Sequence, residues 1–179
     1  MQIRIGLLIC ALALVLAGCS QNQPAPTNGS TTANKATPTP DGPGPLSNEG
    51  FKAELSLVDP PAKLRISQPV VVQVKVKNTS PVTWWARGGP VNTRPDNKFY
   101  IAAGNRWLKA DGTLLTNMDG RYGISKDLKP GEENDVPLKV TAPKDPGEYI
   151  LEVDLVQEGV AWFSDKGSPT AKAKVTVVK

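Results

Sequence analysis

Three carboxylates and one arginine in the second half of the chain are of the residue types that sugar chemistry uses. Asp154 and Glu158 end an alternating segment, while Asp119 and Arg121 flank a glycine. Glycosidases hydrolyse with two carboxyl groups, so Asp119, Asp154 and Glu158 are the candidate catalytic residues. Arg121 offers a second interpretation, because its guanidinium could clamp Asp154 or Glu158 and tie two segments together. A third interpretation is that these polar side chains form the floor of a site and hydrogen-bond the hydroxyl groups of a sugar.

Aromatic and large apolar residues form adjacent pairs at four places. Neighbours on a strand point to opposite faces, so each pair is expected to send one ring inward and the other toward solvent or a covering loop. Exposed Trp and Tyr beside charged residues stack on sugar rings, and they equally anchor protein partners. Loops 87–98 and 117–128 could instead cover these rings. The pairs are Trp84 with Trp85, Phe99 with Tyr100, Trp107 with Leu108, and Trp162 with Phe163.

The composition argues against several classes of chemistry. The 179 residues include no histidine and only two cysteines, Cys10 and Cys19, which counts against a zinc site, a Ser-His-Asp arrangement and a Cys-His nucleophile. No glycine-rich phosphate loop and no calcium-loop spacing occurs. The net charge is +4 and the lysines are spread out, which disfavours nucleic-acid binding. We expect no metal and no cofactor.

Residues 1–18 have the layout of a secretory signal. Arg4 precedes an apolar run that closes on Ala17-Gly18, and polar, proline-rich sequence follows at once. A membrane-spanning helix needs about 20 apolar residues, and this run has roughly a dozen. The segment is therefore expected to direct export and to be removed.

The tetrapeptide LAGC, which ends at Cys19, resembles the lipobox of bacterial lipoproteins. The resemblance implies that the Cys19 thiol carries a diacylglycerol and that the mature chain starts there. Two or more acyl chains, at about 0.8 kcal/mol per buried CH₂, hold a protein firmly on a membrane. The alternative is an ordinary signal peptide that happens to end near a cysteine. With Cys10 removed and Cys19 acylated, the mature protein would have neither a disulfide nor a free thiol.

Residues 20–47 contain six prolines and three glycines, and only Lys35 and Asp41 are charged. They lack the apolar side chains that offset the entropy of ordering. We expect a disordered Pro/Thr/Ser-rich tether over residues 19–47, which as a flexible coil reaches about 30 Å. The length of residues 48–179 suits one domain.

Apolar and polar residues alternate through residues 48–179, and turn signals interrupt the alternation at short intervals. Asp111-Gly112 predicts a hairpin turn, because glycine accepts the positive φ that a tight connection requires. No window has a helical stripe. The fold class expected is all-β, an immunoglobulin-like β-sandwich of about seven to nine strands. The predicted strands are 51–58, 70–77, 82–86, 99–108, 113–116, 134–141, 148–157, 160–164 and 171–178.

The stretch DPGEY at residues 145–149 has the spacing of a tyrosine corner, in which the hydroxyl bonds back to the preceding turn. Several strings between residues 78 and 167 also resemble a module at the C-terminal ends of some bacterial glycosyltransferases and envelope proteins. They are NTSPVTW, NRWLKADGTLL, DGR, LKPGE and VTAPKDPGEYILEVDLVQEGVAWFSDKG. The resemblance implies a sandwich without catalysis of its own that contacts carbohydrate or protein, although fold alone does not assign function.

These observations predict a non-catalytic, lipid-anchored envelope protein whose sandwich binds or scaffolds an envelope glycan or a protein partner. A carboxylate-dependent glycan-processing enzyme is the alternative. We expect a monomer held by its lipid in the cell membrane or outer membrane, facing the periplasm or the exterior. Ser20 permits either membrane, because it is not the aspartate that favours inner-membrane retention. The candidate binding residues are Trp84, Trp85, Tyr100, Trp107, Trp162, Arg121, Asp154 and Glu158.

Overall fold

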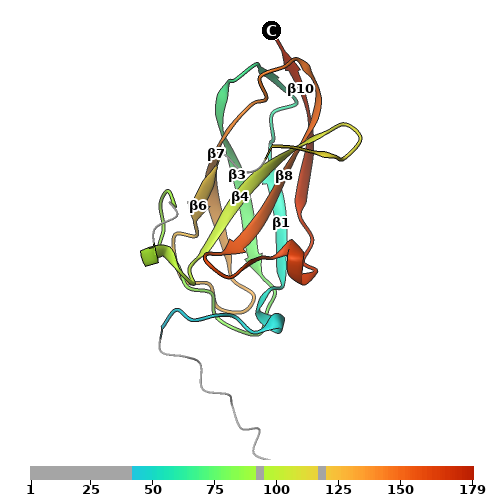
Figure 1. The fold of residues 1–179 in the computed structure, drawn as a ribbon. Coiled ribbons are helices and arrows are strands. Elements are labelled where there is room, and N and C mark those ends of the chain that lie inside the picture. Colours follow the sequence, from blue (N-terminus) through green and yellow to red (C-terminus); the bar gives the residue numbers. More distant parts are fainter. Residues whose placement is uncertain (1–41, 92–94, 117–119) are drawn as a thin grey trace, which may run out of the picture. The chain divides into compact units, whose positions relative to one another are not determined.

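The computed structural model describes residues 42–91, 95–116 and 120–179, and in these ranges the chain is an immunoglobulin-like β-sandwich (Figure 1). No helix in this part is long and apolar enough to cross a membrane. Three short 3-10 helices accompany the strands. The elements are η1 Asn48–Gly50, β1 Ala53–Val58, β2 Lys63–Arg65, β3 Pro69–Asn78, η2 Pro95–Asn97, β4 Ile101–Lys109, β5 Leu114–Thr116, β6 Arg121–Gly123, β7 Glu133–Thr141, β8 Gly147–Gln157, β9 Ala161–Trp162, η3 Ser164–Lys166 and β10 Ala171–Val178.

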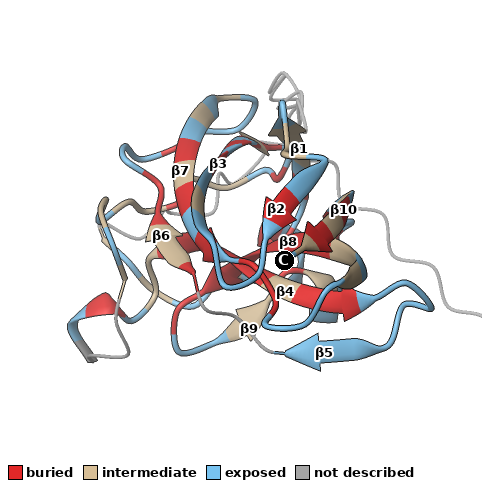
Figure 2. Ribbon diagram, turned by 90° about the horizontal axis from the view of Figure 1, so that it is seen from above, coloured by how far each residue is buried: buried red, intermediate tan, exposed pale blue. Residues whose placement is uncertain are grey.

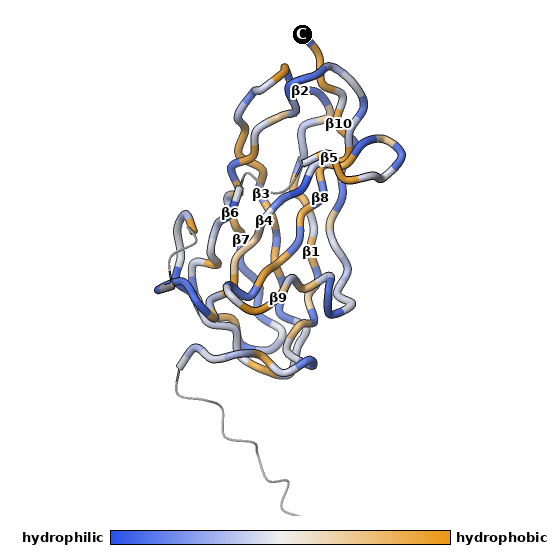
Figure 3. The backbone as a smooth tube through the Cα atoms, viewed as in Figure 1, coloured by the Kyte–Doolittle hydropathy of each residue, from blue (hydrophilic) through white to orange (hydrophobic). Residues whose placement is uncertain are grey.

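One sheet has the order β1-β3-β7 and the other the order β2-β10-β8-β4-β5, with β6 added on β4 and β9 on β8. The pairs are antiparallel except β10 with β2. Val74 lies opposite Leu57 and Val136, so all three point to the same face. Side chains along each strand point alternately into the sandwich and out of it, and Figure 3 shows the accompanying change of hydropathy along the strands.

The hydrophobic core fills the space between the two sheets, where buried positions gather in Figure 2. Fully burying one Val or Leu side chain contributes about 1.5–3 kcal/mol, and the described part contains no cysteine. Packing therefore stabilises this fold without a disulfide. The core residues of the central strands are Val72, Val74, Val76, Trp107, Val136, Leu138, Val140, Leu151, Val153 and Leu155.

Two predicted turns are confirmed. The Tyr149 hydroxyl donates to the Asp145 carbonyl at 3.0 Å, which is the tyrosine-corner bond. Gly112 has φ +85° in the β4–β5 hairpin, and the amide and hydroxyl of Thr113 both donate to Asp111 Oδ1, at 2.9 and 2.7 Å.

Ten strands occur in the described residues, more than the seven to nine predicted. The three-residue strands β2 and β6 were missed. The predicted strand 82–86 is wrong, since Trp84 forms only an isolated bridge with Leu128. The strand predicted from residue 99 begins at Ile101 because Phe99 has φ +75°, which interrupts extended backbone.

The folded part also begins earlier than the expected boundary at residue 48. The fully buried Gln157 side chain accepts the Leu46 amide at 2.9 Å and donates to the Gly44 carbonyl at 2.8 Å. The Leu46 side chain packs against the core. Residues 44–46 are therefore part of the domain, which includes residues up to four positions before the expected boundary.

Candidate functional site

The candidate site lies on the outer face of the larger sheet. Leu151, Val153 and Leu155 of β8 point into the core, so the residues between them point outward. The register sets Arg106 of β4 opposite Glu152. It also sets Gly104 between Asp154 on β8 and Arg121 on β6. We call this group the ionic face; it consists of Arg106, Arg121, Glu152, Asp154, Glu158 and Trp162.

Arg121 and Glu158 form a largely buried ion pair. Arg121 Nη1 lies 2.8 Å from Glu158 Oε2 and 3.1 Å from Oε1. Main-chain bonds fix Glu158, because its amide donates to the Tyr100 carbonyl and its own carbonyl accepts the Phe99 amide. This contact confirms the predicted clamp between Arg121 and Glu158, which ties β6 to the end of β8.

Asp154 does not meet Arg121 as the sequence suggested; Arg106 takes that place. Arg106 Nη2 lies 3.2 Å from Asp154 Oδ2, and the Ser164 hydroxyl donates to the same oxygen at 2.6 Å. Arg106 Nε lies 3.2 Å from Glu152 Oε2, an ion pair without hydrogen-bond geometry. Thr170 and Lys172 contact the other Glu152 oxygen. Each carboxylate of the ionic face is thus engaged by the protein.

The Trp162 ring is half-buried and lies close to both arginines. Its centroid is 5.5 Å from Arg106 Cζ and 5.0 Å from Arg121 Cζ, within the range of cation–π attraction. Gly104 makes room for the ring, since a Cβ there would come within 2.9 Å of Trp162 Cη2. The ring is consequently held in a defined position over the sheet.

Burial dominates the electrostatics of the two central carboxyls. It raises the pKa of Asp154, although bonds from Ser164 and Leu155 and the charge of Arg106 oppose the rise. Burial likewise raises the pKa of Glu158 against the opposing effect of Arg121. A raised pKa suits a general acid, but Asp154 is 1% exposed and Glu158 is 6% exposed, so neither presents its carboxyl openly to a substrate.

The remaining predicted aromatic residues separate into two groups. Trp84 and Trp107 are fully buried in the core, so a binding role for either is wrong. Trp84 packs edge-on against Phe163 and its Nε1 donates to the Gly50 carbonyl at 2.9 Å. Trp85 and Tyr100 are half-buried, and the Arg87 guanidinium lies 6.0 Å from the centroid of the Tyr100 ring.

The rule of one ring in and one out holds for two of the four pairs. It holds at Trp84–Trp85 and at Trp162–Phe163, where the inner ring is fully buried. At Trp107 the neighbouring Leu108 is also buried, so neither member of that pair faces solvent. Phe99 and Tyr100 precede β4 and are both half-buried.

Sequence reasoning missed Arg106, Glu152 and Ser164 as members of this network. Arg106 carried a usable signal, because it alternates with the buried Trp107 on a predicted strand. Its partners required the β4–β8 register, which the sequence does not display. Cys19 and Asp119 lie outside the described residues. Within the described residues no group of three His, Cys, Asp or Glu side chains is placed to hold a metal ion.

Fold and site together define an immunoglobulin-like β-sandwich module. No family model matches the sequence, and no curated protein matches it. The solved structures that are similar to this chain include three with low scores. A CARDB domain from Pyrococcus furiosus in complex with di-metal ions has a TM-score of 0.41 at 17% identity, over 71% of this chain and 88% of that one.

The second, a β-glucosidase from Listeria innocua in complex with glucose, has a TM-score of 0.42 at 15% identity, over 72% of this chain and 16% of that one. The third, the sporulation control protein Spo0M of Bacillus subtilis, has a TM-score of 0.39 at 17% identity, over 72% of this chain and 49% of that one. All three scores lie below 0.5, so these likenesses carry no argument about function.

Proposed function

We propose that this chain is a lipid-anchored protein of the bacterial cell envelope. Cys19 carries the lipid, the following segment serves as a tether, and the sandwich binds an envelope glycan without catalysis. The anchor is supported by the LAGC tetrapeptide at the end of an apolar run. The chain is then held in the cell membrane or outer membrane and faces the periplasm or the exterior.

The observation that carries the binding role is the half-buried Trp162 ring with two guanidinium groups close to it. An aromatic ring can pack against the apolar face of a sugar, and guanidinium N–H groups can donate to its hydroxyl groups. The ion pairs with Asp154 and Glu158 hold both arginines in place, so these side chains lose little conformational entropy when a ligand binds. Protein groups already engage each carboxylate of the ionic face. This supports a surface that hydrogen-bonds a sugar without hydrolysing it.

The anchor is tested by mass spectrometry of the mature N-terminus from a bacterial envelope fraction. We expect a chain that begins at Cys19 and carries a diacylglyceryl group. The Cys19→Ser chain should lack the lipid. Recovery of a secreted, unmodified chain that starts elsewhere would contradict the anchor.

Glycan binding is tested on an array of envelope polysaccharides. Trp162→Ala should weaken retention about tenfold, because stacking on a ring contributes on the order of 1 kcal/mol and its loss also frees both arginines. Val160→Ala, at an exposed position in the turn that precedes β9, is the matched control and should bind normally. Retention of no glycan, or equal retention by Trp162→Ala, would oppose the proposal.

A protein partner is the second candidate. Leu114 and Leu115 on β5 are 53% and 38% exposed, and β5 forms an edge of the larger sheet that is coloured as exposed in Figure 2. Exposed apolar residues on an edge strand suit a protein contact. Crosslinking in the native envelope through position 115 should capture one dominant species, whereas crosslinking through Ser56 should not.

The enzyme alternative depends on the two central carboxyls. If the sandwich hydrolysed a glycan with them, Asp154→Asn and Glu158→Gln would abolish the activity. Under the non-catalytic proposal, purified wild-type protein releases no reducing sugar from the glycan that it retains. Release that both substitutions abolish would establish the alternative.

A further inference from the structure

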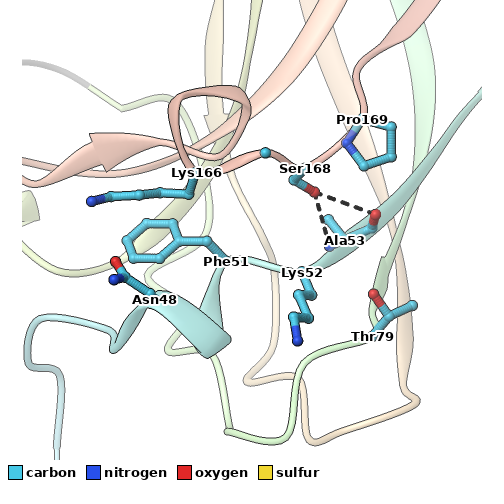
Figure 4. A pocket seen from close by; sticks show the side chains of 9 residues that line it. Asn48, Phe51, Lys52, Ala53, Thr79, Lys166, Ser168 and Pro169 are labelled. Carbon is cyan, nitrogen blue, oxygen red and sulfur yellow. Dashed lines mark hydrogen bonds between the residues drawn. The ribbon is translucent and has the colours of Figure 1, made fainter.

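A second candidate binding site lies outside the ionic face. A shallow pocket of about 300 Å³ lies where β1 begins, between the end of β3 and the loop that joins η3 to β10 (Figure 4). Phe51 and Ala53 line it on one side, and Lys166 and Ser168 on the other. The ionic face contributes no residue to this pocket.

The charge of the pocket is positive. Lys52 and Lys166 line it, and none of its lining residues is acidic. Lys52 contacts Glu49, but both side chains are more than half exposed, and such a pair contributes little. Among the described residues Lys166 has no carboxylate within ion-pair distance; its ammonium lies 5.8 Å from the centroid of the Phe51 ring.

Hydrogen-bond donors accompany these cations. The side chains of Asn48 and Thr79 also line the pocket. Ser168 is committed to the fold, because its hydroxyl bonds to the amide and carbonyl of Ala53, as the dashed lines in Figure 4 show. Two lysines, a threonine and an asparagine therefore line one hollow, although the two ammonium groups point in different directions in Figure 4.

We infer that this pocket binds a phosphate-bearing group. A phosphoryl group has several acceptor oxygens and a charge that matches lysine point charges. The volume exceeds that of phosphate alone, so it also admits the group to which the phosphate is attached, such as glycerol. Residues 42–47 lead directly into Asn48, so the pocket is at the end of the domain that the expected tether enters. The phosphate could belong to a lipid headgroup or to a soluble polymer.

The test uses the unacylated chain that starts at Ser20, labelled with ¹⁵N. Glycerol 3-phosphate should shift the amide signals of Thr79, Lys166 and Gly167, while glycerol should not. Lys166→Gln should raise the dissociation constant about tenfold, the loss expected for one charge-assisted hydrogen bond. Lys63→Gln is the matched control, because Lys63 is exposed and pairs with Thr176 near the other end of β10.

Sedimentation with vesicles identifies the source of the phosphate. Binding to vesicles that contain phosphatidylglycerol, but not to phosphatidylcholine alone, supports a lipid headgroup if Lys166→Gln abolishes it. Binding of glycerol 3-phosphate alone supports a soluble source. Binding of neither probe, or binding that Lys166→Gln leaves intact, overturns the inference. The assignment goes beyond the proposed function, and since this chain is unacylated, either can fail without the other.

Discussion

The Arg121–Glu158 ion pair is largely withdrawn from water, with the two side chains 17% and 8% exposed. Removal of one partner from such a pair leaves a desolvated charge, which costs more than the pair contributes. We expect Arg121→Met to lower the free energy of unfolding by about 3 kcal/mol. Urea unfolding followed by tryptophan fluorescence measures the change.

Two further variants test the cause of that loss. The double substitution Arg121→Met/Glu158→Leu should recover most of it, because it removes both charges of this ion pair. Lys75→Met removes an exposed pair with Glu133 and should cost less than about 1 kcal/mol. A similar loss in Lys75→Met and Arg121→Met would refute the role given to burial.

Asp154 gives the stability of the fold a pH dependence of known sign. Because burial raises its native pKa above the ordinary 3.8, the native state binds more protons than the unfolded state in that interval. The carboxyl therefore contributes most stability below pH 3.8 and loses that contribution as the pH rises through the native pKa. Asp154→Asn lacks this dependence.

The measurement is a series of urea unfolding curves from acid to neutral pH. The free energy of unfolding of the wild type, minus that of Asp154→Asn, should fall as the pH rises. Arg106, which contacts Asp154, stays charged throughout the range and adds no titration of its own. A difference that rises with pH would mean that Arg106 and Ser164 outweigh burial.

At the scale of elements, one side chain joins three segments. Gln157 at the end of β8 bonds to Gly44, Leu46 and the Phe99 carbonyl. Gln157→Leu leaves these main-chain groups without that partner, and we expect a loss of about 3 kcal/mol in unfolding free energy. The Leu46 amide, which donates to Gln157 Oε1, should then exchange its hydrogen much faster.

Hydrogen exchange followed by NMR measures that amide directly. Gln73→Leu on the exposed face of β3 is the matched control and should leave the Leu46 amide protected. Unchanged protection in Gln157→Leu would show that the packing of the Leu46 side chain alone holds residues 44–46.

The elements that sequence predicted well are those whose pattern is local. β3 and β7 alternate over nine or ten residues and bury one face, so their period is visible in the sequence. β2 spans three residues and is completed by a parallel pairing with β10, far along the chain. Tryptophan is a residue type that is common in strands, yet Trp84 forms only an isolated β-bridge with Leu128, because turns flank it.

The ionic face was predictable only in part for the same reason. Alternation along β8 correctly sends Asp154 to the outer face, but it predicts a solvated residue, and the structure buries it. The covering groups come from elsewhere, since Ser164 follows β9 and Arg106 lies on β4. Contacts between distant strands depend on register, which no local pattern encodes.

At the scale of the whole molecule, the two sheets share one core. Trp84 and Phe163, from segments far apart in the chain, pack together there with Phe51, and Trp107 belongs to the same cluster. The chain also returns over long distances to complete its sheets, as when β10 fits between β2 and β8. Such long-range pairings must form together, which favours slow, cooperative folding on the order of milliseconds to seconds.

One shared core without a disulfide predicts a single unfolding transition that is independent of reductant. Trp84 and Trp107 report tertiary packing by fluorescence, and far-ultraviolet circular dichroism reports the sheets. For the chain that starts at Ser20, which has no cysteine, both signals should have the same urea midpoint, with or without dithiothreitol. Coincident midpoints would mean that the core contacts and the sheets are lost in one step. A fluorescence midpoint at lower urea than that of circular dichroism would mean that part of the core unfolds before the sheets, which would contradict the prediction.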